Sequence, residues 1–144
     1  MPVFGAQSKK QLAMALPQLQ SVLNEAIQHY DFKILDAVRG KAAQERAVLR
    51  GQSKVHFGES AHNWVPCIAV DLFPAPYDWN NKKAFADLYH VMMAASKKLN
   101  IPIRSGLDWN MDGLGPHDTD NWDGGHYELH PWRSFRHLSH LYVE

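Results

Sequence analysis

SAHNWVPCIAVD, residues 60–71, and WDGGHYEL, residues 122–129, are the two stretches that decide how this chain is interpreted. They contain His62, Asp71 and His126, which offer two imidazoles and one carboxylate. Such a set suits a catalytic zinc ion, which takes three protein ligands and leaves a fourth position for water. The sequence therefore predicts a zinc site built by two segments that lie far apart in the chain.

Two acidic residues are candidates for proton transfer beside this site. Asp123 lies three residues before His126, and Glu128 lies two residues after it. On a strand, His126 and Glu128 share one face, so Glu128 is a rival to Asp123 as general base. Spacing alone leaves this choice open. It also makes the ligand set itself only moderately specific, because nine histidines in the chain make accidental combinations easy.

The apolar run CIAVDLF, residues 67–73, indicates a buried strand. An aspartate inside such a run is costly unless it is paired or bound to a cation, so a metal ligand explains Asp71 better than a turn does. Cys67 in the same run is expected to be a buried structural thiol rather than a nucleophile. As the single cysteine, it also excludes an intramolecular disulfide and a multi-cysteine zinc site.

Hydrophobic periodicity predicts helices around these strands. Apolar residues at helical spacing indicate a helix pair interrupted at Pro17, and residues 84–99 give the clearest helix. Residues 41–50 are rich in helix formers and follow a short expected strand over residues 32–38. Arg39 stands at this strand-to-helix junction, where site residues concentrate, although a lone arginine is more commonly only a surface charge.

The end of the chain is expected to complete the sheet. Residues 126–130 alternate in polarity and predict the last strand. The tail from Pro131 to Glu144 contains several apolar residues, and we expect it to pack back on the domain.

A long loop dense in Asp, Asn and Gly precedes the second stretch. It opens with the D-x-N-x-D-G pattern of a calcium-binding loop, in the order Asp108, Asn110, Asp112 and Gly113. The twelfth position is Thr119, where the full motif has a bidentate Glu, although Asp118 and Asp120 lie close enough to substitute. The sequence therefore leaves two interpretations open, a weak calcium site and a plain surface loop.

Length and composition indicate a single soluble domain over residues 1–144. The formal net charge is zero with histidine neutral, so no basic field points to nucleic acid or to an anionic membrane. The N-terminus lacks the apolar segment of a signal peptide, and no run of about 18 apolar residues could span a membrane. We therefore expect no nucleic-acid partner and no membrane insertion, and we expect a monomer.

The motifs resemble those of the peptidoglycan zinc peptidases. Ser60-Ala61-His62 with Ala69-Val70-Asp71 resembles the S-x-H and A-x-D motif of that family, and residues 123–129 resemble its D-x-x-H-F-E-L ending. Arg39 with Gln44 matches its R-x4-Q element, and the segment 106–109 resembles its G-G-D-W stretch. The resemblance covers nearly the whole chain in order.

Two departures from the family pattern affect the local geometry. His62 and Asp71 are nine positions apart where the family has about seven, so we interpret Val65-Pro66 as part of a two-residue insertion. Ala37 stands where the family often has Gly. Despite these departures, both predicted zinc ligands, His62 and Asp71, are present in the sequence.

The resemblance implies an α+β fold, with helices flanking a small, mostly antiparallel sheet that carries the zinc site, as in the D-Ala-D-Ala peptidase and Hedgehog folds. It implies that His62, Asp71 and His126 bind zinc. It further implies that Asp123 is the general base and that Arg39 stabilises the polarised carbonyl and its oxyanion.

The function implied is that of a phage-type endolysin, which hydrolyses the peptide stem of peptidoglycan, at L-Ala–D-Glu. It would be made in the host cytoplasm and act on the cell wall after release, and the loop 108–120 would tune its activity through calcium. One alternative is a D-alanyl-D-alanine carboxypeptidase of the same fold. The other is a non-catalytic, metal-stabilised binding module, which would need neither Asp123 nor Arg39.

Overall fold

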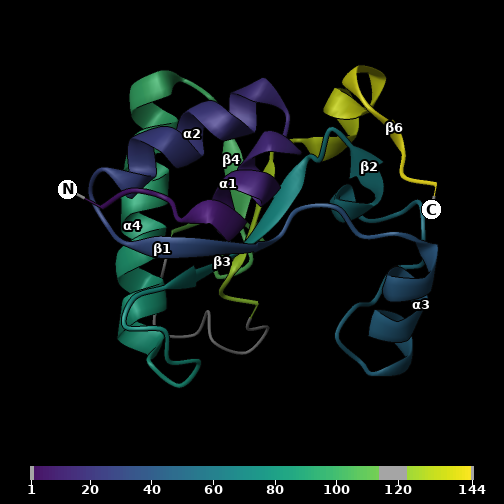
Figure 1. Cartoon of the computed structure of the whole chain (residues 1–144), viewed down its shortest axis with the longest axis horizontal. Coiled ribbons are helices and arrows are strands. Elements are labelled where there is room, and N and C mark those ends of the chain that lie inside the picture. Colours follow the sequence, from purple (N-terminus) through teal and green to yellow (C-terminus); the bar gives the residue numbers. More distant parts are fainter. Residues whose placement is uncertain (1, 114–122, 144) are drawn as a thin grey trace.

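A four-stranded antiparallel sheet organises the fold, in a computed structural model that describes residues 2–113 and 123–143 (Figure 1). The strands in spatial order are β1 (Phe32–Asp36), β3 (Ala69–Pro74), β5 (His126–Leu129) and β4 (Ile103–Ser105). All three neighbouring pairs are antiparallel. The predicted α+β class with a small antiparallel sheet is confirmed.

Helices α1 (Ala6–Ala13), α2 (Pro17–Ile27) and α4 (Lys82–Leu99) pack on this sheet. Alternate strand residues turn inward and are fully buried against α2 and α4, among them Val70, Leu72 and Tyr127. The opposite face of β3 carries Asp71 and Phe73, which are only half-buried. The sheet therefore has a core face under the helices and a second face that is free to hold a site.

None of the described helices has the length and apolar character needed to cross a membrane.

Local sequence accounts for where the helices begin and end. Pro17 occupies the first turn of α2, where its missing N–H costs no hydrogen bond. Helix α4 begins at Lys82, two residues before the predicted start, because the Asn81 side chain accepts a hydrogen bond from the Ala84 N–H at 3.0 Å and caps the first turn. It ends at Leu99, and Asn100 caps its C-terminus in a left-handed conformation with φ of 55°.

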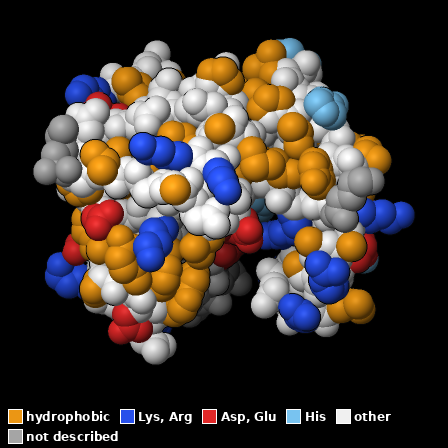
Figure 2. Space-filling model, in the orientation of Figure 1, with side chains coloured by type: hydrophobic (Ala, Val, Ile, Leu, Met, Phe, Trp, Pro, Cys, Tyr) orange, Lys and Arg blue, Asp and Glu red, His pale blue; other side chains and the backbone are white. Residues whose placement is uncertain are grey.

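Helix α3 (Lys41–Leu49) lies apart from the other helices, beyond the end of β1 (Figure 1). It follows β1 through the segment that contains Arg39, as predicted. Figure 2 shows a hollow in the surface between α3 and the rest of this face.

The C-terminal segment adds structure that the sequence did not predict. β5 is not the last strand, because η2 (Trp132–Leu138) and β6 (His140–Leu141) follow it. β6 pairs with β2 (Trp64–Val65) in a second, two-stranded sheet, which lies at the opposite end of the molecule from α4 (Figure 1). The inserted Val65 thus pairs with His140. The expectation that the tail packs back is confirmed by Trp132, which is buried.

Candidate active site

The three predicted ligands come together on the free face of the sheet. Asp71 on β3 lies directly opposite His126 on β5, so their side chains leave the sheet on the same side. His62 belongs to the short 3-10 turn η1 (Ala61–Asn63), which precedes β3. Among the described residues, these three form the one group of histidines, cysteines and acids close enough to hold a metal ion.

The distances among the three side chains match a tetrahedral metal site. His62 Nε2 lies 3.2 Å from His126 Nδ1 and 3.4 Å from Asp71 Oδ1, and His126 Nδ1 lies 3.6 Å from Asp71 Oδ1. Ligand atoms at ~2.0–2.1 Å from a tetrahedral zinc are about 3.3 Å apart. The donor set and its spacing therefore fit such an ion without rearrangement.

Hydrogen bonds orient the two imidazoles so that one nitrogen of each faces the cluster. His62 Nδ1 donates to the Ala37 carbonyl at 3.1 Å, which leaves the Nε2 lone pair toward Asp71. His126 Nε2 donates to Glu128 Oε1 at 2.7 Å, which leaves Nδ1 toward the same point. Partners of this kind fix the tautomer and ring direction of metal-binding histidines.

The Glu128 carboxylate accepts a hydrogen bond on each of its two oxygens. Its Oε1 accepts from His126, and its Oε2 accepts from Arg104 Nη2 at 2.9 Å. The carboxylate is buried, with 3% of the residue exposed. Oε1 thus holds His126, which shares its strand face, while Oε2 is engaged by Arg104.

The cluster is electrostatically suited to a cation. Burial alone would raise the pKa of Asp71, but His62 and His126 hold it well below its usual range. Burial alone would lower the pKa of His126, but hydrogen bonds to Asp71 and Glu128 raise it to about 10. Two carboxylates around one imidazole therefore stabilise positive charge at this point of the sheet.

Arg39 reaches the same cluster from the β1–α3 junction. Its Nη2 lies 3.5 Å from Asp71 Oδ2, and its Nη1 donates to Gln44 Oε1 at 3.1 Å. Gln44 is fully buried and donates to Ser53 Oγ at 2.8 Å. The two residues of the R-x4-Q element, Arg39 and Gln44, are thus in direct contact, and this contact aims the guanidinium at the ligand set.

Asp123 stands at the entrance to β5, and Gly106 permits its position. The Asp123 N–H donates to the Gly106 carbonyl at 3.3 Å, and the Gly106 N–H donates to the His126 carbonyl at 2.8 Å. A Cβ at position 106 would collide with the Asp123 backbone. Asp123 is exposed as a residue, yet partial desolvation of its carboxylate raises its pKa above the ordinary value, against the charges of His126, His62 and Arg39. These interactions bring Asp123 to the same site as the three ligand candidates.

Three residues of this site were missed by sequence reasoning. Asn63 is fully buried and uses its side chain to hold η1 and Arg39, while Arg104 anchors Glu128 from β4. Trp109 lies over the His126 ring, with ring centroids 5.1 Å apart. Only Trp109 carried a signal, because it belongs to the G-G-D-W-like stretch.

Asp108, Asn110 and Asp112 are also brought together, in a turn that ends at Gly113. Asp108 Oδ2 accepts from the Tyr89 hydroxyl and from the Gly113 N–H, each at 3.0 Å, and Asp108 Oδ1 accepts from the Asp112 N–H at 3.2 Å. Asn110 Nδ2 donates to Asp112 Oδ2 at 3.2 Å. The remaining positions of the predicted loop lie outside the described residues, namely Asp118, Thr119 and Asp120.

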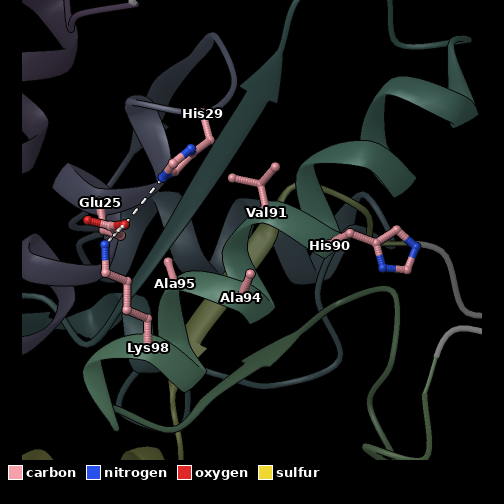
Figure 3. A pocket seen from close by; sticks show the side chains of 7 residues that line it. All are labelled: Glu25, His29, His90, Val91, Ala94, Ala95 and Lys98. Atoms are coloured by element: carbon pink, nitrogen blue, oxygen red, sulfur yellow. Dashed lines mark hydrogen bonds and ion pairs between the residues drawn. The ribbon is translucent and has the colours of Figure 1, made fainter.

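A separate surface groove lies between α2 and α4. Figure 3 shows Glu25 between His29 and Lys98, and the dashed lines mark distances of 3.2 Å and 2.7 Å. His90 points away from these three side chains. No residue of the groove belongs to the site on the sheet.

Cys67 is fully buried away from solvent, and burial raises the pKa of its thiol to about 12. The expectation of an inert structural thiol agrees with this environment.

Comparisons with known proteins identify the family and the fold of this chain. A family model described as phage L-alanyl-D-glutamate peptidase matches residues 2–130. The L-alanyl-D-glutamate peptidase of Escherichia phage T5 is 36% identical over 136 residues, which span 88% of this chain and 96% of that protein. The crystal structure of the Serratia marcescens L-Ala D-Glu endopeptidase ChiX covers 94% of this chain and 92% of its own, with a TM-score of 0.70 and 24% sequence identity. The structural likeness establishes that both chains share this α+β fold.

Proposed function

Because this chain belongs to the phage L-alanyl-D-glutamate peptidase family, we propose that it is a phage-type endolysin that hydrolyses the L-alanyl–D-glutamate bond of the peptidoglycan stem with the help of zinc. One observation carries the metal-dependent part of this proposal. His62, Asp71 and His126 lie at the mutual distances of tetrahedral ligands, with one free nitrogen of each imidazole facing inward.

We assign His62, Asp71 and His126 as the zinc ligands. Zinc held there would polarise the scissile carbonyl and make water a better nucleophile near neutral pH. The hydrogen bonds that His62 donates to the Ala37 carbonyl and His126 donates to Glu128 support this assignment, because they hold the two imidazoles in the tautomers that a metal requires.

We assign Asp123 as the general base, which takes a proton from the attacking water and returns it to the leaving amine. Its raised pKa supports this role, because a base works best when its pKa approaches the working pH. Glu128 is less suited, since both of its oxygens are engaged with His126 and Arg104. We therefore assign Glu128 as a positioning residue for His126.

We assign Arg39 to the developing negative charge on the scissile carbonyl oxygen. Its guanidinium is held by Gln44 and lies beside Asp71, so it is a fixed cation at the edge of the site. Preorganised charge of this kind stabilises an oxyanion without reorganisation during the reaction.

The alternatives are weaker for specific reasons. The named relatives are both L-Ala–D-Glu peptidases, which favours that bond over the terminal D-Ala–D-Ala bond of a carboxypeptidase. A binding module would not need Arg39 and Asp123 to converge on the metal ligands. The wall is thus the proposed site of action, after release from the host cell.

We also propose that the turn at Asp108–Gly113 binds calcium weakly and tunes activity. The three side chains that offer oxygen atoms already gather in one turn, and the same segment leads toward Asp123. Millimolar calcium should raise the activity of the zinc-loaded enzyme, and Asp112→Ala should remove that response. Equal activity with and without calcium in both proteins would leave this segment a surface turn.

Zymography on bacterial wall tests the zinc-dependent function. We expect a clearing band that disappears in EDTA and returns with about one equivalent of zinc, while His126→Ala gives no band under either condition. A band that persists after complete metal removal would contradict the metal-dependent reaction.

A further inference from the structure

An exposed stack of aromatic rings lies on the segment that joins β3 to α4. The Trp79 and Phe73 rings are nearly parallel, with centroids 4.2 Å apart and an interplanar angle of 13°. Trp79 also stacks on Phe85 at 5.8 Å, yet 58% of this tryptophan is exposed. Figure 2 shows hydrophobic side chains gathered over this segment, in the lower left of the view. We call Phe73, Trp79 and Phe85 the aromatic platform.

The aromatic platform continues the face of the sheet that carries the metal ligands. Phe73 follows Asp71 by two residues on β3, so both side chains leave the strand on the same side. Two residues along a strand span roughly 7 Å. The exposed Trp79 ring therefore begins one stacking distance beyond Phe73, within reach of a substrate bound at Asp71.

The proposed substrate places a sugar at this distance, and the present inference rests on that proposed function. In peptidoglycan, the L-Ala nitrogen is joined through a lactyl group to the muramic sugar of the glycan. L-Ala and the lactyl group together span about two residue lengths, roughly 7 Å. An enzyme that cuts after L-Ala must accommodate the sugar ring next to its catalytic centre.

The chemistry of the aromatic platform suits a sugar ring. One face of Trp79 packs on Phe73 and Phe85, which leaves a flat, electron-rich surface that is held in place before substrate arrives. Such a surface attracts the C–H groups on the apolar face of a pyranose ring. Lys33 lies opposite Phe73 on β1, with its amino group 4.2 Å from the Tyr77 ring centre, and it offers donors to sugar oxygens.

We propose that Trp79 and Phe73 bind the muramic sugar of the glycan and thereby make the enzyme prefer wall-linked stems over free peptides. An exposed aromatic surface could instead bind the peptide part of the stem or a second copy of this chain. The experiments below distinguish these two cases from sugar binding.

A matched pair of substrates tests the proposal. One is a muramyl peptide that begins with the sugar and L-Ala–D-Glu, and the other carries an acetyl group in place of the muramyl group. We expect kcat/KM to be higher for the muramyl peptide, and Trp79→Ala to lower the ratio of the two kcat/KM values roughly fivefold to tenfold. Trp79→Phe, which keeps a ring, should restore most of the ratio. The control Leu138→Ala removes an exposed side chain elsewhere, 44% exposed, and should leave the ratio unchanged.

An equal loss on both substrates, or no loss, would overturn the sugar assignment. Equal loss would show that Trp79 acts on the peptide or on the structure of the site. Zinc content and thermal unfolding of Trp79→Ala, compared with the unsubstituted protein, identify the structural case.

A binding measurement separates this proposal from the catalytic one. The indole N–H signal of Trp79, assigned by its absence in Trp79→Phe, should shift when N-acetylmuramic acid, the sugar that the proposal names, is added. A shift in a protein that hydrolyses neither substrate would support the sugar site while refuting the peptidase. Hydrolysis without any shift would refute the sugar site alone. A shift that depends on protein concentration without sugar would assign the surface to a second copy and overturn the proposal.

Discussion

At His126, the two ring nitrogens have different partners, and this explains why one of them is oriented toward the other predicted ligands. Nε2 is bonded to Glu128, and Nδ1 faces His62 and Asp71. The alternation of residues 126–130 predicted that His126 and Glu128 share a face. It could not separate the roles of Glu128 and Asp123, because the partner that engages Glu128 is Arg104, on another strand 24 residues away.

Paired substitutions of the two acids test their roles. Asp123→Asn should keep bound zinc and lower kcat about 10²-fold or more, because a general base is lost. Glu128→Gln should instead weaken zinc affinity about 10- to 100-fold, because the orientation of His126 is lost. Zinc content by metal analysis and kcat at saturating zinc separate the two effects. If Glu128→Gln alone removes turnover at full zinc occupancy, the two roles are reversed.

Arg39 is expected to act on turnover rather than on the metal. A guanidinium cannot ligate a cation, so Arg39→Ala should lower kcat about 10²-fold while zinc content stays at one equivalent. Arg46→Ala, in the middle of α3, is the control for loss of a positive charge. A normal rate for Arg39→Ala on wall substrate would show that Arg39 is an ordinary surface charge without a role in turnover.

At the scale of elements, periodicity predicted most of the fold, since α2, α4 and the strands around Asp71 bury regular apolar faces. Short elements were missed for a physical reason. The turn η1 and the β2–β6 pair contain two or three residues each, too few to show a period. They are stabilised by tertiary partners instead, such as Asn63, whose carbonyl accepts from the Tyr142 N–H at 2.8 Å.

The η1 turn should depend strongly on the Asn63 side chain. Asn63 Oδ1 accepts from the Gly58 and Ser60 N–H groups, and its Nδ2 donates to the Arg39 carbonyl and Gln44 Oε1. Asn63→Ala leaves buried polar groups without partners, so we expect a loss of about 2–3 kcal/mol in the free energy of unfolding. Gln28→Ala, which removes an exposed amide, should change it by less than about 0.5 kcal/mol. Similar values for both variants in urea unfolding would show that η1 does not depend on Asn63.

For the whole molecule, the site joins parts of the chain that are distant in sequence. Its residues come from the β1–α3 junction, η1, β3 and β5, and only the sheet register brings Asp71 opposite His126. The family motifs allowed the residues to be named in advance. Their distances, and the Arg104 and Asn63 contacts, depend on tertiary packing that no local pattern contains.

Because zinc would bind only the folded site, it should stabilise the whole domain. At a free zinc concentration a thousandfold above Kd, the gain is about 4 kcal/mol, which corresponds to roughly 10 °C in Tm. Calorimetry of the metal-free and zinc-loaded protein measures this shift, and His62→Ala should lose most of it. An equal shift in His62→Ala would place the zinc elsewhere.

Mass spectrometry of wall fragments released by the zinc-loaded enzyme tests the central claim most directly. The account predicts peptides whose new N-terminus is D-Glu, together with glycan that retains only L-Ala. Fragments that have lost only a terminal D-Ala, with the L-Ala–D-Glu bond intact, would contradict it.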